Sequence, residues 1–459
     1  MFIVAASGIN RWRMEKTPKT FFTLLRYFLA VYLLFTAVFY NRSAFAEVWQ
    51  NTPLATLFKV FAGVLLLAWS YPAAKWFLNK NRPSYKFCCL LALQFLGFDI
   101  LAAANSLTAL TGAIVLICCC NYWLIYRHWD EAKVRSAARM YAIYRAVFAG
   151  LAGSGAGVLM HYAGGAGYEQ VKNYFLQNND YGWPVLTGVA GIVAAFIFLL
   201  ALAPFHIWFV NFIRVGILPV SGYITIVPPL IYFGALINLM RGPLAGMSDF
   251  AMPMLEAAAA ISLLLGAISA GGEKNIRCFF GYISIYCLGF ALLGMMDFST
   301  PSIIASFAYI IVALLSLAGV YTVFSGLKSH SEYLSELEAL QGFYHLRPYM
   351  AAALMIFMFS LMGLAPTLGF VGYLAILNNL TAAGAIVRLG ALAGGILLAA
   401  AACLKIVRTI YFMPQGQKYD RADKTVYVCL FINMAIVVIS LIFPAWLMRD
   451  ALTILLGMK

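Results

Sequence analysis

The sequence predicts an all-α polytopic membrane protein, and its composition and the length of its apolar blocks both point to this class. The 459 residues are 63% hydrophobic and only 10% charged, with a mean hydropathy of +0.87. A soluble domain is about half apolar and about a quarter charged, so this chain has too few charges to cover a wetted surface. The apolar residues also come in blocks of about twenty, the length that a helix needs to cross a hydrocarbon core.

About thirteen blocks are expected to cross the membrane. They are too long for barrel strands and lack strict alternation, so the helix is the spanning form that satisfies the backbone. In chain order they cover residues 21–39, 54–71, 85–104, 107–126, 137–160, 184–208, 218–240, 251–270, 276–296, 300–326, 349–376, 385–412 and 425–446.

The basic residues between the blocks predict the orientation. Most of them fall on the side of the N-terminus, and the opposite side carries only Arg42, Lys172, Arg241, Arg449 and Lys459. This bias predicts a cytoplasmic or matrix N-terminus, in a bacterial inner membrane or a mitochondrial inner membrane. The net charge of +14 therefore reflects topology, and no nucleic-acid partner is expected. Residues 11–46 resemble a signal peptide, but Arg26 interrupts the apolar stretch, so an uncleaved helix is expected.

The sequence offers no pattern for a metal or redox cofactor. Cys118, Cys119 and Cys120 are consecutive in one block, where neighbours on a helix point about 100° apart, so they are interpreted as packing residues. There is no Gly-rich dinucleotide loop after a strand and no cysteine cluster for an iron–sulfur centre. The polar insertion at 328–347 is expected to form a short surface helix with Glu332, Glu336 and Glu338 on its solvated face.

Two prolines divide the chain into matching parts. Pro204 lies in the block 184–208 and Pro366 in the block 349–376. If 85–240 and 251–412 are two inverted five-helix repeats, each proline breaks the fourth helix of its repeat. Residues 1–84 then form two N-terminal helices, and 425–459 the C-terminal helix. An ordinary proline kink is the alternative for either helix alone, and the matched placement favours a functional break.

Four segments resemble a known family in their order and spacing. Residues 203–208 (APFHIW), with Pro219-Val220 after them, resemble A/V-P-F-H-x-W, and 360–372 (SLMGLAPTLGFVG) resemble S-L-x-G-x-P-P-T-x-G-F-x-G. Residues 275–290 and 102–107 fit two further motifs. Over about 54–415 the set resembles the antiporter-like membrane subunits of respiratory complex I, nearest to bacterial subunit N and mitochondrial NADH dehydrogenase subunit 2. That family has fourteen helices, so the resemblance implies that this chain lacks the first.

The departures from the family concern its buried ionisable residues. The resemblance places the family's glutamate on Ile114 and three of its lysines on Leu199, Pro229 and Tyr373. A fourth lysine position keeps its charge as Arg139, and the family's histidine is retained as His206.

A proton relay needs groups that gain and lose protons at accessible pH, and few remain. Isoleucine, leucine and proline cannot titrate, and arginine stays protonated. The remaining candidates for a proton path are His206, Glu256, Arg139, Arg145 and Lys405. His206 is expected to cap a carbonyl freed by Pro204, and Lys405 with Arg408 to anchor a helix end at the interface. A relay of Glu256, Arg145 and His206 is the alternative.

The resemblance implies a membrane-arm subunit of a proton-translocating NADH:quinone oxidoreductase whose own proton channel is degenerate. Its partners are expected to be other membrane-arm subunits and the lipid bilayer. Flavin, iron–sulfur clusters and quinone are expected in partner subunits, with no catalytic residue in this chain. Two alternatives stay open. The first is an active proton or cation antiporter-like subunit of an Mrp-type or membrane-hydrogenase complex, and the second is a structural membrane scaffold.

Overall fold

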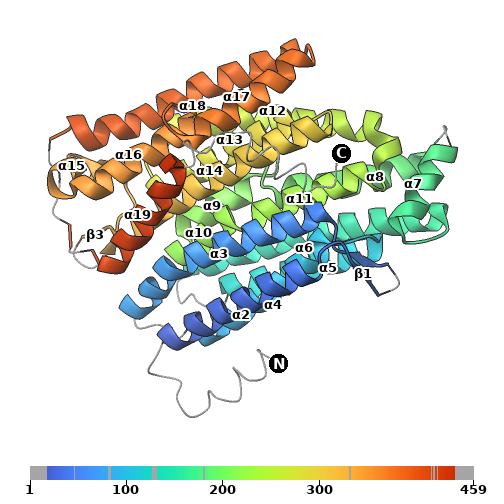
Figure 1. The fold of residues 1–459 in the computed structure, drawn as a ribbon, viewed down its shortest axis with the longest axis horizontal. Coiled ribbons are helices and arrows are strands. Elements are labelled where there is room, and N and C mark those ends of the chain that lie inside the picture. The colour runs from blue at the N-terminus through green and yellow to red at the C-terminus, as the bar shows by residue number, and fades with distance from the viewer. Residues whose placement is uncertain are drawn as a thin grey trace. The chain divides into compact units, whose positions relative to one another are not determined.

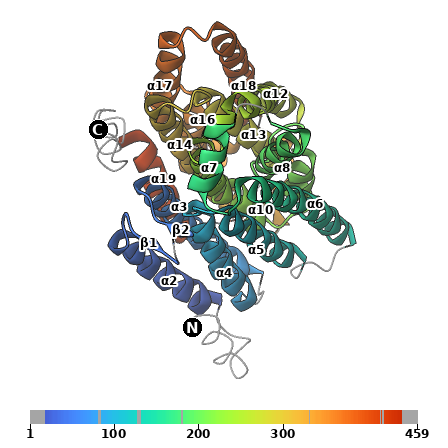
Figure 2. The same ribbon diagram turned by 90° about the vertical axis from the view of Figure 1, so that its right-hand side faces the viewer.

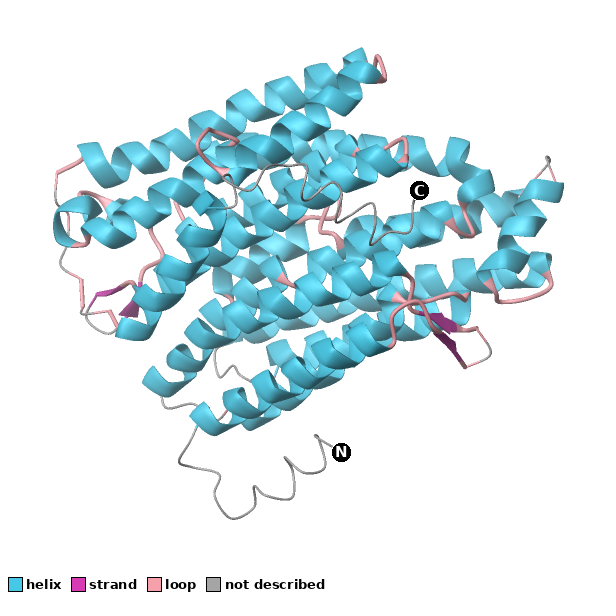
Figure 3. Ribbon diagram, viewed as in Figure 1, coloured by secondary structure: helices cyan, strands magenta, loops and turns pink. Residues whose placement is uncertain are grey.

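The computed structural model describes residues 18–45, 47–80, 84–126, 132–178, 181–329, 332–414, 416, 419–420 and 422–439. Helices make up most of these residues, and two small antiparallel hairpins supply the strands of the described chain (Figure 3). The hairpins are β1–β2 (Ser43–Ala44 and Trp49–Gln50) and β3–β4 (Lys328–Ser329 and Glu332–Tyr333). The predicted all-α membrane class is confirmed. The chain divides into two compact units.

Unit 1 comprises Met1–Phe196, Val215–Tyr223 and Leu230–Ala251 as far as they are described. Figures 1 and 2 show its first helices side by side. It holds α2 (Pro18–Val38), α3 (Pro53–Asn79), α4 (Tyr85–Ala102), α5 (Leu107–Tyr126), α6 (Ala132–Ala163), α7 (Tyr168–Gln177) and the larger parts of α8 (Trp183–Leu199), α10 (Leu218–Ile226) and α11 (Pro228–Arg241), with the 3-10 turn Ala245–Met247.

Unit 2 comprises Ile197–Arg214, Ile224–Pro229 and the described part of Met252–Lys459. It holds α9 (Ile207–Val215), most of α12 (Ser248–Gly272), α13 (Ile276–Gly294), α14 (Thr300–Gly326), the 3-10 turn Leu337–Leu340, α15 (Phe343–Leu346), α16 (Pro348–Met362), α17 (Leu368–Ala382), α18 (Ile386–Phe412) and α19 (Lys424–Ile439).

Each predicted apolar block contains helix in its described part, while residues 440–446 of the last block lie outside the described residues. The count of thirteen spans is not confirmed. Ten helices of the described chain are long and apolar enough to cross a membrane, and four shorter apolar helices accompany them. The short ones include α8, α16 and α17, because the blocks that contain Pro204 and Pro366 are each broken in two. Both breaks fall at the predicted prolines.

The predicted surface helix at 328–347 is wrong. The segment forms the β3–β4 hairpin, a 3-10 turn and the one-turn helix α15. Gly342 has a φ of +61°, which ends any right-handed helix there, and Pro348 opens a new one. The buried Leu337 and Leu340 tie the segment to the protein, and the Leu337 N–H donates to the Lys274 carbonyl. Glu336 and Glu338 are exposed as predicted.

Glycines let the helices of unit 2 approach backbone to backbone. A Cβ built on Gly266 of α12 would lie 2.7 Å from the Tyr286 nitrogen, and one on Gly289 of α13 would lie 2.8 Å from the Leu263 nitrogen. Real Cβ atoms do not come so close, so larger residues at either position would force these two helices apart. Small residues at helix contacts supply much of the packing in membranes, where the hydrophobic effect does not drive helices together.

A buried ion pair joins the N-terminal helices of unit 1. The Lys59 ammonium, only 1% exposed, lies 2.7 Å from Asp99 and donates to Asn51 Oδ1 at 3.0 Å. Asp99 also accepts from Tyr32 Oη at 2.8 Å and Trp49 Nε1 at 3.0 Å. The cluster thereby links α2, α3, α4 and the β1–β2 hairpin. Each charge has a charged partner and further hydrogen bonds, the condition under which buried charges are tolerated.

Removal of one charge from this pair should destabilise unit 1. In Asp99→Asn the Lys59 ammonium stays buried without its carboxylate, so we expect the free energy of unfolding to fall by about 3 kcal/mol. Equilibrium unfolding in mixed micelles measures the change. The matched control is Asp249→Asn, an exposed acid in the first turn of α12, which should cost less than about 1 kcal/mol. Equal losses in both variants would contradict the role assigned to the pair.

Candidate functional site

The first broken helix lies where α8 ends. The Leu202 N–H donates to the Ile197 carbonyl and the Ala201 N–H to the Phe198 carbonyl, and Ala201 has a φ of +54°. This is the Schellman arrangement, which satisfies carbonyls at a helix C-terminus. The Ala203 N–H donates to Ser262 Oγ at 2.7 Å, and that hydroxyl donates to the Ala258 carbonyl. Helix α9 then begins at Ile207.

The second broken helix ends in the same way. The Leu364 N–H donates to the Phe359 carbonyl and the Gly363 N–H to the Ser360 carbonyl, with Gly363 at a φ of +70°. In both breaks the left-handed residue is followed by Leu-Ala-Pro, and both Ala-Pro bonds are cis. Both breaks lie in unit 2, and they share one local structure built from the same four-residue pattern, Ala or Gly followed by Leu-Ala-Pro.

Tyr373 closes the second break from the inside. Its hydroxyl donates to the Leu361 carbonyl at 2.8 Å and lies 2.8 Å from the Tyr286 hydroxyl. Since a phenol has one proton, Tyr286 is the donor in the second bond. The ring packs against Phe290 and Tyr309, with centroids 4.5 and 5.2 Å away. Tyr373 is 4% exposed. Its neutral hydroxyl is therefore a buried donor for the Leu361 carbonyl, which the break leaves without a helical partner.

Another backbone carbonyl at this break also accepts a hydrogen bond within unit 2. The Thr367 hydroxyl donates to the Leu364 carbonyl. Gly369 packs onto the Ser360 carbonyl so closely that an added Cβ would lie 2.0 Å from the oxygen. The loop itself, at 364–366, is exposed. The outer side of the break thus faces the surroundings of the chain, and its inner side is filled by aromatic rings.

Arg145 is the buried cation in the interior of unit 1. It is 3% exposed, its Nη1 lies 3.4 Å from Tyr232 Oη and 3.7 Å from Cys118 Sγ, and its guanidinium lies 4.9 Å from the Tyr141 ring centroid. These contacting groups are neutral and polarisable. Ile114, buried on α5, precedes Cys118 by four residues and so shares its helix face. Ile114, the position that the resemblance assigns to a glutamate, therefore lies on the helix face that Arg145 contacts. It presents a hydrocarbon side chain there and no carboxylate.

Arg139 lies on a different side of α6. It is exposed, because six residues along a helix rotate the side chain to roughly 120° from Arg145. The arginine that faces the protein interior is therefore Arg145. Leu199 and Pro229, the other two positions without their lysines, are buried in unit 2.

The remaining predicted residues of unit 2 have specific partners. Glu256 of α12 accepts from Arg388 Nε and Nη2 of α18 at 2.9 and 3.0 Å, a two-point ion pair between helices. The Lys405 ammonium donates to the Gly271 carbonyl at 2.9 Å. His206 is half-buried beside the Pro204 carbonyl, and its ring faces Tyr282 at 6.5 Å between centroids. The capping role of His206 stays a prediction.

Sequence reasoning missed several partners. Tyr286 and Ser262 carried no signal, because an isolated hydroxyl in an apolar block is usual. Lys59 and Asp99 are conspicuous charges in such blocks, but nothing in their spacing of forty residues predicts their contact. The described residues contain no group of three or more His, Cys, Asp or Glu side chains that could hold a metal ion.

Comparison with known proteins identifies the family. A sequence model described as "NADH:quinone oxidoreductase/Mrp antiporter, TM" matches residues 104–437, well over half of the chain. The chain belongs to this family. Among curated relatives, NADH-quinone oxidoreductase subunit N of Rhodospirillum rubrum is 25% identical over 367 residues, covering 79% of this chain and 74% of the relative. Subunit N of Methylovorus glucosotrophus is 25% identical over 428 residues, covering 92% and 88%.

Solved structures of this family share the fold. A chain of respiratory complex I from Thermus thermophilus matches with a TM-score of 0.80 at 20% identity, covering 98% of this chain and 97% of that one. A chain of the Mrp complex from Dietzia sp. matches with a TM-score of 0.82 at 14% identity, covering 99% and 96%. At such identities the match establishes the fold alone.

Loss of the Tyr373 hydroxyl should destabilise the second break. Tyr373→Phe keeps the ring packing but leaves the Leu361 carbonyl without a donor and Tyr286 without its acceptor. We expect a loss of about 1–3 kcal/mol in unfolding free energy, measured in mixed micelles. Tyr344→Phe is the matched control, since Tyr344 is 44% exposed and its ring packs against that of Tyr411. If the two variants are equally stable, the hydroxyl does not close the break.

Proposed function

We propose that the chain is a membrane-arm subunit of a proton-translocating NADH:quinone oxidoreductase, similar to subunit N, and that its own proton route is closed. Family membership and the subunit N relatives support the setting. The observation that carries the second part is the Tyr286–Tyr373–Leu361 hydrogen-bond chain, which places two neutral phenols at the inner side of the second break.

Proton transfer through a membrane needs side chains that change protonation state, or water chains between them. Phenols titrate near 10 in water and remain neutral at physiological pH. Arg145 is a fixed cation, and its contacts include a phenol, a thiol and an aromatic ring. Lys59 with Asp99 and Glu256 with Arg388 are held as ion pairs. These groups favour a structural rather than a conducting role.

In this proposal the redox cofactors belong elsewhere. Flavin, iron–sulfur clusters and quinone would bind partner subunits, while this chain contributes apolar helices that assemble with neighbouring membrane subunits in a bacterial inner membrane. The chain's part is to hold the arm together and not to carry out a reaction.

A working proton or cation transporter of the Mrp type is the second candidate. The observation that favours it is the exposure of the Glu256–Arg388 pair, whose side chains are 34% and 25% exposed. A partly exposed carboxylate inside a spanning segment is able to exchange a proton with a wet cavity. The match to a chain of the Mrp complex is compatible with this candidate as well.

Assembly is tested by purification through a tag on this chain from its native membranes. We expect NADH:quinone reductase activity, flavin and iron–sulfur clusters to copurify in constant ratio to the chain. Recovery of the chain with membrane subunits alone, free of flavin and iron–sulfur clusters, would refute the complex I setting.

Conduction is tested in proteoliposomes with an entrapped pH dye. We expect the proton permeability of the wild type, Glu256→Gln and His206→Ala to equal that of protein-free liposomes. The matched control is Glu338→Gln, an exposed acid outside the spanning segments. Rapid flux that Glu256→Gln abolishes and Glu338→Gln preserves would establish the second candidate instead.

A further inference from the structure

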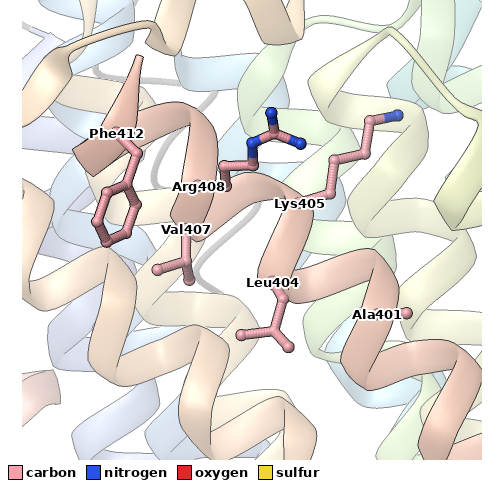
Figure 4. A pocket seen from close by; sticks show the side chains of 6 residues that line it. All are labelled: Ala401, Leu404, Lys405, Val407, Arg408 and Phe412. Atoms are coloured by element: carbon pink, nitrogen blue, oxygen red, sulfur yellow. The ribbon is translucent and has the colours of Figure 1, made fainter.

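An open hollow lies along the last turns of α18 (Figure 4). Two of its six lining side chains are cations, Lys405 and Arg408, and they extend the same way from the helix. The other four are apolar, namely Ala401, Leu404, Val407 and Phe412. Residues 401, 404, 405, 408 and 412 follow the helical i, i+3, i+4, i+7, i+11 pattern, so one stripe of α18 combines positive charge with apolar surface.

The surface of this hollow is open. Leu404 is 50% and Phe412 81% exposed, and Lys405 and Arg408 are also exposed. Gly271 at the end of α12 receives one hydrogen bond from the Lys405 ammonium, which has three protons to donate. A Cβ on Gly271 or Gly272 would meet no atom within 4 Å, so there is free space beside the ammonium.

No carboxylate neutralises the two cations within the described residues, because neither Lys405 nor Arg408 takes part in a salt bridge there. The acid that follows α12, Glu273, is engaged elsewhere. It accepts from Arg214 Nη2 and from the N–H groups of Lys274 and Asn275. The hollow therefore presents two positive charges to whatever lies against it.

Aromatic residues mark the depth of the hollow in the membrane. Tyr411 packs against Tyr344 with ring centroids 4.9 Å apart, next to the exposed Phe412, and such aromatics gather where hydrocarbon meets headgroups. Lys405 precedes Phe412 by seven residues and Arg408 by four, which corresponds to roughly 10 and 6 Å along the axis. Long basic side chains at this depth reach toward the lipid phosphates. The distribution of Lys and Arg along the chain predicts that this helix end lies on the side that carries most of the basic residues.

We propose that this hollow binds an anionic phospholipid of the leaflet on the N-terminal side of the membrane. Its phosphate lies between Lys405 and Arg408, and an acyl chain follows Leu404 and Ala401 toward the membrane interior. A zwitterionic lipid brings its own cation to the two positive charges, so the site favours a lipid with net negative charge. This inference is independent of whether the chain conducts protons.

Native mass spectrometry of the full chain, released from micelles with equal amounts of phosphatidylglycerol and phosphatidylcholine, tests the proposal. We expect the wild type to retain phosphatidylglycerol preferentially. Each of Lys405→Gln and Arg408→Gln should reduce this retention by roughly fivefold, and the double variant should abolish the preference. Lys405→Arg keeps the charge and should keep the preference.

The matched control is the double variant Arg135→Gln with Lys424→Gln, which removes two exposed basic residues that do not line the hollow. It should retain phosphatidylglycerol like the wild type, and circular dichroism checks that all variants are folded. Equal retention of both lipids by the wild type, or an equal loss in the control, would overturn the proposal. Displacement of the lipid by millimolar inorganic phosphate would also overturn it, since the site would then recognise a soluble anion.

Discussion

The structure depends on one constraint, which is that every backbone polar group in the hydrocarbon core needs a partner within the protein. Two helices of this chain are broken, and each break frees carbonyl and N–H groups at membrane depth. A Schellman turn around Ala201 or Gly363 satisfies the first of them, and neutral hydroxyls satisfy others. Ser262 accepts from the Ala203 N–H, and Tyr373 donates to the Leu361 carbonyl. Both helices are thus broken, and the carbonyl and N–H groups named here form hydrogen bonds within the protein.

Charged side chains obey the same rule, because a buried charge also needs a partner within the protein. A buried ion costs several kcal/mol unless a counter-ion and hydrogen bonds compensate it, and Lys59 and Asp99 meet this condition with three neighbouring polar side chains. Glu256 and Arg388 meet it through two hydrogen bonds. Charges held in this way bind helices together, which suits the structural role that we propose. Lys405 and Arg408 differ, because they lie exposed near a helix end where lipid phosphates are available.

Local features of the sequence predicted the fold well. Hydropathy located the spanning helices, and Pro204 and Pro366 located both breaks, because proline removes a hydrogen bond wherever it stands. Features that depend on three-dimensional contact were not predictable. The resemblance identified Tyr373 only as a position where the family has a lysine. Its hydrogen bond to the Leu361 carbonyl, twelve residues earlier, depends on how α17 packs on α16 and could not be predicted. Arg139 was the expected retained charge, but helix rotation exposes it and buries Arg145. The segment 328–347 failed as a helix because its backbone bonds to 274–276 instead.

The proposed closed route means that the interiors of both units lack a path for protons through the bilayer. A cryo-electron microscopy map of the chain in lipid, at a resolution that shows ordered water, would reveal such a path. We expect dry aromatic packing around Tyr286, Phe290 and Tyr373, with at most isolated waters near Arg145. An unbroken file of water and protonatable side chains from one membrane face to the other would contradict this expectation.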